Sequence, residues 1–265
     1  MIKRLYYYSV AVFYGSVLLS ILTLIGSVAS NVRKNQIFYI YNKKEMFKGH
    51  CFPKAIILQA VYFKLRFSLS YRDVEELLSI RGVKVDHATI QRWVFKFTPL
   101  VEQQFRKRKK LVGKRWRLDE TYIKVKGEWR YLYRAVDKQG NTVDFLLTKR
   151  RQRISAQKFL IKAIENNVKP ELINIDKSGA NKAAIKLYNR RNYSNIKIRQ
   201  CKYLNNIVEQ DHRMIKWRIM LGLGFKEFES AKRTISGIEV VRMIKKNQLV
   251  NPESSTYKSF ISLAS

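Results

Sequence analysis

Apolar and polar residues alternate from Arg115 to Asp137, on both sides of Lys126-Gly127-Glu128. Alternation with a period of two is typical of strands with one buried face, and a short break containing glycine joins two such strands into a hairpin. A third strand is predicted from Val143 to Thr148. Asp119 lies inside the first strand with basic sequence on both flanks, and an isolated acid in such surroundings is a candidate for chemistry.

Helical spacing of apolar residues precedes this hairpin, from Pro53 to Phe67. A second helix should begin at Ser70, because Ser70 and Asp73 form a capping-box pattern. After a turn at Gly82, Asp86 can cap a third helix. Three short helices with a tight glycine turn before the last predict a helix-turn-helix, although ordinary helical bundles share this pattern. The outward residues of the third helix, which could reach base edges or phosphates, are His87, Thr89, Gln91, Arg92 and Lys96.

The chain after the third strand alternates between helix and strand patterns. Ser155 is a predicted N-cap for a helix that buries Ala156, Phe159 and Leu160. The further elements expected are a strand at 171–175, a helix at 180–190, a strand at 196–199 and a helix at 205–221. This order predicts an α/β fold, a ribonuclease-H-like mixed sheet with flanking helices, preceded by a small all-α helix-turn-helix domain.

The patterns divide the chain into five segments. These are a hydrophobic N-terminal extension (1–45), the helix-turn-helix domain (46–105), a basic linker (106–114), the ribonuclease-H-like domain (115–224) and a C-terminal helical segment (225–265). The last segment could contribute to assembly or simply pack on the core.

Charge is the unusual feature of the composition. The 265 residues include 53 Lys and Arg but only 20 Asp and Glu, a net charge of +33. Such an excess repels itself unless it meets a polyanion, and nucleic acid is the commonest one. A merely basic soluble protein is the alternative. Two cysteines, Cys51 and Cys201, and three histidines give neither a disulfide framework nor a zinc spacing, which suits a reducing cytoplasm.

A run of basic residues links the two predicted domains. Eight of the twelve residues from Arg106 to Arg117 are Lys or Arg, beginning with Arg106, Lys107 and Arg108. The run could be a solvated linker, and it could also neutralise phosphates without sequence preference.

The N-terminal segment admits three interpretations. Leu5 to Val32 is an uncharged stretch of 28 residues, long enough to span a bilayer. It also resembles a signal peptide with a weak cleavage site at Ser27-Val28-Ala29. In the third interpretation Met46 is the true start, and residues 1–45 are upstream sequence read in frame.

Three acids from three predicted elements stand out. Asp119 lies within a strand, Asp176 at the carboxyl end of another, where catalytic groups collect in open sheets, and Glu209 on the last helix. The predicted buried stripe of that helix is Ile207, Val208, Met214, Ile215 and Ile219. Glu209, His212, Arg213 and Lys216 are expected on its opposite face. Hard oxygen ligands without cysteine or histidine select Mg²⁺ or Mn²⁺, the ions of two-metal phosphodiester chemistry.

Several longer motifs resemble the insertion-sequence DDE transposases of family six. They are WRLDETY at 116–122, WRYLYRAVD at 129–137, Asp176-Lys177, NIVEQDHR at 206–213 followed by Lys216-Trp217-Arg218, and LRFSLSYRD at 65–73. The resemblance runs from about Phe47 to Pro252. Family members begin close to Met46, which favours the upstream-sequence interpretation of residues 1–45.

The resemblance implies a site and a reaction. Asp119, Asp176 and Glu209 would bind two Mg²⁺ or Mn²⁺ ions, while Lys216, with Arg213 nearby, would contact the DNA end. Glu120 should point away from Asp119, and Asp137 should lie at a turn. The implied activity is nicking at terminal inverted repeats, then transfer of the 3′-hydroxyls into target DNA, typically through a replicative cointegrate.

The implied partners are DNA and a second copy of the chain, as a homodimer or larger assembly, in the cytoplasm at the nucleoid. An organic cofactor and a membrane are not expected. Two alternatives stay open. One is a non-catalytic DNA-binding protein from a decayed element, and the other is a structure-specific nuclease of the same fold that cuts without joining.

Overall fold

The computed structural model describes residues 47–176, 179–221 and 224–264. By their contacts, Met1–Cys51 and Phe52–Ser265 are two separate compact units. The three interpretations of residues 1–45 fall outside the described residues. Among the described helices, none combines the length and the apolar character needed to cross a bilayer. The five-segment division remains a prediction.

Three helices form the beginning of the second unit. Helix α2 spans Lys54–Arg66, α3 spans Tyr71–Ser79 and α4 spans His87–Lys107. The predicted capping box is confirmed, because the Ser70 side chain accepts from Asp73 N while the Asp73 side chain accepts from Ser70 N. Asp86 caps α4 as predicted. Helix α4 continues into the basic run, which shortens the linker.

Strands β1 (Arg115–Val125) and β2 (Glu128–Asp137) are the predicted hairpin. Lys126 and Gly127 alone connect them, with φ angles of 50° and 79°. Positive φ at both central residues defines a type I′ turn, whose twist matches that of the flanking strands. Glycine takes this conformation without steric cost, and the turn fixes a register in which Asp119 lies opposite Arg134.

The sheet has five strands in the order β3-β2-β1-β4-β5. Strand β3 spans Thr142–Thr148, β4 spans Leu172–Ile175 and β5 spans Lys197–Gln200. The hairpin and β3 are antiparallel, whereas β4 runs parallel to β1 and β5 parallel to β4. On the edge of β1 away from β2, β4 pairs with residues 115–117 and Phe225 bridges to Val125, so that Asp119 lies on the stretch between these two contacts.

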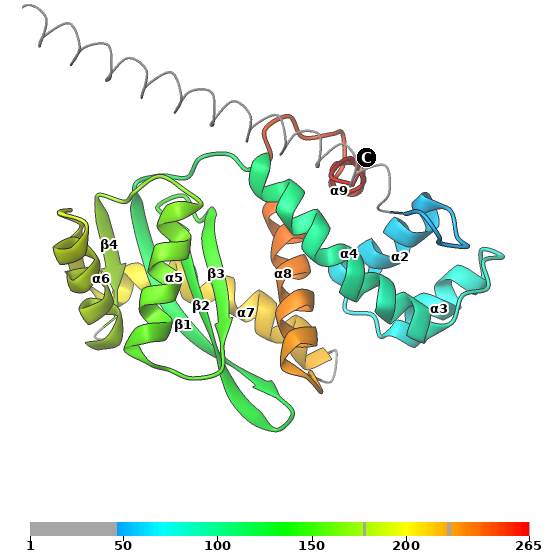
Figure 1. Ribbon diagram of the computed structural model, residues 1–265, viewed down its shortest axis with the longest axis horizontal. Coiled ribbons are helices and arrows are strands. Elements are labelled where there is room, and N and C mark those ends of the chain that lie inside the picture. Colours follow the sequence, from blue (N-terminus) through cyan, green and yellow to red (C-terminus); the bar gives the residue numbers. More distant parts are fainter. Residues whose placement is uncertain (1–46, 177–178, 222–223, 265) are drawn as a thin grey trace, which may run out of the picture. The chain divides into compact units, whose positions relative to one another are not determined.

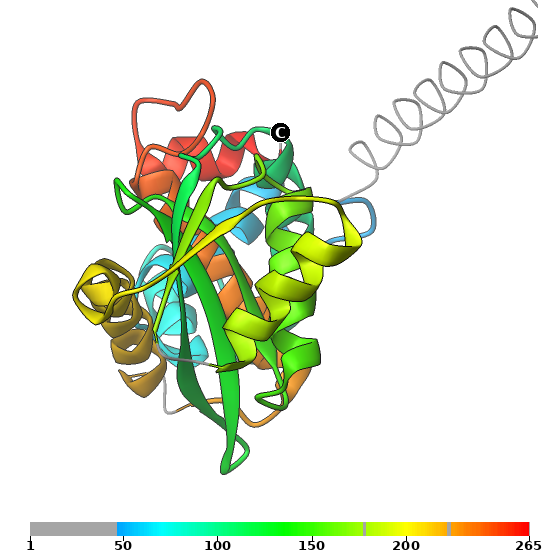
Figure 2. The same ribbon diagram turned by 90° about the vertical axis from the view of Figure 1, so that its left-hand side faces the viewer.

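Helices cover both faces of this sheet, as Figure 2 shows. Helices α5 (Arg153–Glu165) and α6 (Gly179–Arg191) lie on one face, and α7 (Asn206–Leu221) lies on the other, against β1 and β2. A 3-10 turn, Lys202–Asn205, precedes α7. The predicted order of strands and helices is therefore confirmed, and the part of the chain that contains the sheet has a ribonuclease-H-like fold (Figure 1).

The predicted N-cap at Ser155 is wrong. Helix α5 begins three residues earlier than predicted, with Gln152 at its N-cap position. The Ser155 hydroxyl instead donates to the carbonyl oxygen of Arg150. The face predicted to be buried is confirmed, because Ala156, Phe159 and Leu160 join the core between the sheet and this helix.

Helix α8 (Phe228–Lys245) joins helices α2 and α4 to the sheet. It packs against α4 and α2 on one side and β3 on another, while α9 (Thr256–Ser262) packs on α8 and α2. The contact is close at Gly237, where an added Cβ would lie 2.5 Å from Leu65 and 2.8 Å from Thr98. Glycine is therefore required at this crossing, and α8 packs closely against the first three helices.

Candidate active site

Asp119 and Glu120 point to opposite faces of the sheet, as the alternation of β1 requires. An Asp119 oxygen lies 3.5 Å from His212 Nδ1 on α7. Glu120 pairs instead with Arg151 and accepts from Asn181 Nδ2 on α6, at 2.9 Å. The prediction that Glu120 points away from Asp119 is confirmed.

The Asp119 carboxyl is largely buried and lies within reach of the charges of the two other predicted acids. Its side chain is 15% exposed. Burial, together with the negative charges of Asp176, Glu120 and Glu209, raises the pKa of Asp119 to about 7, against 3.8 for an ordinary aspartate. Asp176 directly follows β4, and Glu209 lies in the first turn of α7. Three elements therefore bring their carboxylates close enough to repel one another, which a bound cation would relieve.

This donor set suits divalent magnesium or manganese. All three candidate ligands are carboxylates, and Asp176 and Glu209 remain open to solvent, half-buried and exposed respectively. Hard cations prefer such oxygen ligands. The carboxylates therefore fit a divalent metal ion of this kind.

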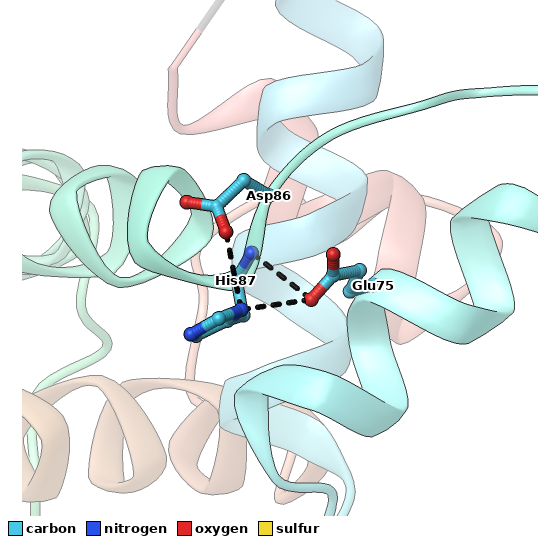
Figure 3. A group of neighbouring side chains, drawn as sticks. All are labelled: Glu75, Asp86 and His87. Atoms are coloured by element: carbon cyan, nitrogen blue, oxygen red, sulfur yellow. Dashed lines mark hydrogen bonds and ion pairs between the residues drawn. The ribbon is translucent and has the colours of Figure 1, made fainter.

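Among the described residues, the compact group of possible metal ligands lies elsewhere. Ligand atoms of Glu75, Asp86 and His87 all lie within 4.8 Å of one another. Figure 3 shows what this group does: His87 Nδ1 is 3.0 Å from Glu75 and 3.1 Å from Asp86, and His87 N donates to Glu75. Asp86 also caps α4. The contacts of this group therefore connect α3 to the start of α4, which gives the group a structural role.

The predicted faces of α7 need correction. His212 was expected on the outer face but is 5% exposed, whereas Ile207 and Met214, expected inside, are 38% and 52% exposed. Val208 and Ile215 are buried as predicted. The true inner stripe has the right helical period but includes two polar residues, Asp211 and His212, which hydrophobicity alone assigns to the surface.

His212 is a residue of the site that the sequence analysis misplaced. Burial, with the positive charges of Arg134 and its neighbours, lowers the pKa of His212 to about 3, so that the ring is neutral. Within the described residues, its buried Nε2 has no hydrogen-bond partner. A neutral ring therefore lies beside the Asp119 carboxylate, with its Nδ1 at 3.5 Å.

An ion network lies under the site, and the sequence analysis did not find it. Arg134 and Glu239 are completely buried, with Arg134 Nε 2.7 Å from Glu239, and Arg134 also donates to Asp211 at 2.6 Å. Arg242 and Lys246 of the α8 region complete the surroundings of Asp211. The network joins β2, α7 and α8. It fixes α7 at Asp211, two residues after Glu209 along the helix.

Asp137 has a structural role, consistent with its exclusion from the site. Its buried carboxylate accepts from Gly113 N, Gln139 N and Asn141 N. These bonds close the turn between β2 and β3, where the sequence analysis placed Asp137.

The five residues of α4 that were predicted to contact DNA differ in their exposure to solvent. Gln91, Arg92 and Lys96 are exposed on its outer face, while His87 and Thr89 are half-buried. The stripe on the opposite side, which includes Trp93 and Phe97, is buried as predicted. Three of the five candidates are therefore presented to solvent.

The basic run is not a free linker. Arg106 forms ion pairs with Glu102 and with Asp144 of β3, and Arg108 donates to Ser262 O. Lys107 is exposed. Lys109 donates to Val143 O, and burial lowers its pKa to about 8. At least three of these basic residues stabilise the junction between α4 and the sheet.

Arg213 and Lys216 are exposed on α7, as predicted. Helical spacing places both on the side of α7 that carries Glu209, one and two turns further along. Any polyanion held at the carboxylates would meet these two cations.

Comparison with known proteins shows the class of protein to which this chain belongs. Residues 113–248 match the protein family described as "DDE domain". The "Transposase for insertion sequence-like element IS431mec" of Staphylococcus aureus is 41% identical over 207 residues, covering 76% of this chain and 90% of its own length. The "Transposase for insertion sequence element IS257 in transposon Tn4003" of the same species gives the same figures. The fold and these matches define an enzyme, a polynucleotidyl transferase with a DDE domain.

Within that class, the chain belongs to the DDE transposases of insertion-sequence family six. The family uses a divalent metal ion and acts on DNA. Solved structures with a similar backbone include the HTLV-2 integrase catalytic core domain in complex with magnesium, at 17% identity and a TM-score of 0.41 over 60% of this chain and 100% of that one. The catalytic core domain of BIV integrase has 15% identity and a TM-score of 0.39, over 57% and 95% of the two chains.

Proposed function

We propose that this transposase binds the terminal inverted repeats of its element, cuts there, and joins the freed 3′-hydroxyls to target DNA. The observation that supports the proposal is the position of Asp119 on β1, beside His212 of α7, the helix that also carries Glu209, while Asp176 directly follows β4, the parallel neighbour of β1. Burial, together with the charges of Asp176, Glu120 and Glu209, raises the pKa of Asp119, and bound cations would relieve that repulsion.

Asp119, Asp176 and Glu209 would hold two Mg²⁺ or Mn²⁺ ions. When bound, the ions activate the attacking hydroxyl and stabilise the leaving oxygen. The protein fixes the three ligands from a strand, a strand end and a helix. In the joining step the freed 3′-oxygen of the element forms a bond to a phosphorus of the target, and the bond from that phosphorus to the target's own 3′-oxygen breaks. The attacking hydroxyl gives up its proton and the released target 3′-oxygen takes one up, so that a 3′-hydroxyl is left on the target strand. A covalent protein intermediate is not required.

Arg213 and Lys216 would contact the DNA end held at the carboxylates. Gln91, Arg92 and Lys96 would read or position the repeat from α4, and Lys107 would add a phosphate contact. His87, Thr89, Arg106 and Arg108 are weaker candidates because they are half-buried or paired within the protein.

Two element ends must be held together for joining, so we propose a homodimer or larger assembly. The product would be a replicative cointegrate, and the enzyme would act in the cytoplasm, at the nucleoid. An organic cofactor plays no part in this proposal.

A strand-transfer assay with the element's own end and Mg²⁺ tests the proposal. Asp119→Asn, Asp176→Asn and Glu209→Gln should each abolish cutting and joining, because each removes a metal ligand, and should leave end binding within about threefold. Glu171→Gln is the matched control, since this exposed acid lies just before β4 and its carboxylate pairs with Lys114 on the surface, at 3.1 Å. It should keep full activity.

Three outcomes would contradict the proposal. Strand transfer that survives all three substitutions would exclude these acids as the site. End binding without any cutting by the native chain would point to a DNA-binding protein from a decayed element. Cutting without joining would identify a nuclease.

A further inference from the structure

An open hollow of about 450 Å³ lies beside the β1–β2 hairpin, lined by Tyr122, Trp129, Tyr131 and Lys216. We call it the aromatic hollow. The side chains of Tyr122 and Trp129 are 41% and 59% exposed. Large apolar rings gathered at a surface often mark a binding site, and the role proposed for the carboxylates does not account for them.

The hairpin register assembles the hollow. Tyr122 lies opposite Tyr131, and Lys124 lies opposite Trp129. The Tyr122 ring is 5.3 Å from that of Tyr131 and 6.5 Å from that of Trp129, with interplanar angles of 66° and 80°. Because the rings meet edge to face, they do not stack on one another but line the sides of the hollow. A flat ligand ring can therefore lie against one of them.

Cations surround these rings. Lys216 lines the hollow itself. Lys124 Nζ is 5.8 Å from the centre of the Trp129 ring, and Arg151 donates to the Tyr122 hydroxyl at 3.4 Å. An apolar protein segment would meet three positive charges here. A ligand that combines a flat ring with a negative group matches both features, and a nucleotide has both.

The hollow is also near the carboxylates. Tyr122 shares its sheet face with Glu120, opposite to Asp119, but Lys216 of α7, on the Asp119 side of the sheet, also lines the hollow. Lys216 is seven residues along α7 from Glu209, about 10 Å at helical rise. Since stacked DNA advances about 3.4 Å per nucleotide, a strand at the carboxylates reaches the hollow within about three nucleotides.

We propose that the aromatic hollow binds one unpaired nucleobase of the DNA strand that occupies the active site. The base lies against Tyr122 or Trp129, and the adjoining phosphates lie near Lys124 and Lys216. A paired base in a duplex offers only its edges to a protein, so the bound base must have left the stack. This inference rests on the proposed function, because it takes DNA at the carboxylates as given.

The test compares two oligonucleotides on the full chain by fluorescence anisotropy. One is a labelled single-stranded octamer of thymidines, and the other has the same phosphates but abasic sugars. The native chain should bind the thymidine octamer roughly tenfold more tightly, since stacking on an aromatic ring is worth that much per base. Trp129→Ala should lose most of this preference, and Trp129→Phe should keep most of it.

Tyr193→Ala is the matched control, because Tyr193 is a fully exposed aromatic residue that lies outside the hollow. It should leave the preference unchanged. As a second measurement, photo-crosslinking from 5-iodouracil in the octamer should label Tyr122, Trp129 or Tyr131. Equal thermal unfolding midpoints would show that the variants are folded.

Several results would overturn the inference. They are an unchanged base preference in Trp129→Ala, an equal loss of affinity for both octamers, or crosslinks only to other residues. A changed oligomeric state with the base preference intact would make the hollow an interface between copies. Strand transfer is measured separately: joining without base preference refutes this inference alone, and base preference without joining refutes the proposed function alone.

Discussion

The Arg134 guanidinium lies 2.6 Å from a carboxylate oxygen of Asp211, in the interior beneath the carboxylates of the site. Arg134 is also the register partner of Asp119 across the hairpin. The buried Arg134 therefore lies on the strand next to Asp119 and also contacts α7, the helix that carries Glu209.

Replacing Arg134 should destabilise the protein strongly. Arg134→Met leaves Glu239 buried without its cation, and breaking a buried ion pair from one side costs about 3–5 kcal/mol. The free energy of unfolding in urea measures this loss. The double variant Arg134→Met, Glu239→Leu should recover much of it, because Asp211 keeps Arg242 and Lys246. A double variant no more stable than the single one would contradict this account.

Acid should unfold the protein through two buried aspartates. Burial alone would raise the pKa of Asp144, but Lys162 and Arg106 hold it below its usual value, and Arg134, Lys246 and Arg242 do the same for Asp211. A carboxyl with a lowered folded pKa stabilises the protein above about pH 3.8, its usual value, and loses that contribution as the pH falls through the folded pKa. Unfolding free energies should therefore drop below about pH 4.

Asp144→Asn isolates one of these contributions. It should cost about 1.5–3 kcal/mol at pH 6, because Arg106 loses its charge-assisted hydrogen bonds to Asp144 but keeps Glu102, and it should make the acid dependence shallower. Glu171→Gln removes the same charge at an exposed site and should change neither quantity. If the unfolding free energy of Asp144→Asn falls as steeply with acid as that of the native chain, groups other than Asp144 cause the acid unfolding.

Magnesium should stabilise the native chain against heat. Ions that bind only the folded state add stability that grows with the ratio of their concentration to the dissociation constant, and here they also relieve the repulsion around Asp119. The melting temperature should rise with Mg²⁺ and return with a chelator. Asp119→Asn should abolish the rise, whereas Glu171→Gln should keep it. An equal rise in Asp119→Asn would place the ion elsewhere, for example at Glu75, Asp86 and His87.

Binding assays with the terminal repeat should distinguish the α4 residues that contact phosphates from those that contact bases. Arg92→Ala or Lys96→Ala should weaken binding to any DNA and lower the salt slope by about one, because one phosphate contact is lost. Gln91→Ala should instead cost about 1–3 kcal/mol on the cognate repeat only. Lys186→Ala, an exposed lysine on α6, is the control and should change neither. Unaltered slopes in both α4 variants would remove this helix from the DNA interface.

Much of the fold could be predicted from local patterns. Period-two alternation defined the hairpin, Ser70 and Asp86 marked two helix starts, and the order of elements identified the sheet. These features depend on residues a few positions apart, so their physical cause lies within a short stretch of sequence. The candidate acids came from the same patterns and from longer motifs.

The inner face of α7 was decided only by tertiary structure. Val208, Asp211, His212 and Ile215 share one helical stripe, but two of them are polar. A polar residue is buried when a partner compensates it, and the partner of Asp211 is Arg134, 77 residues away. The basic run behaved in the same way, since Arg106 finds Asp144 38 residues further on.

The sequence by itself therefore determined the strands, the helices and the acids that they carry. Only the tertiary structure decided which charged side chains are buried as ion pairs and which remain on the surface for a partner. The physical reason is that burial of a charge depends on a counter-charge brought near by folding, and local sequence does not say which distant residue that will be.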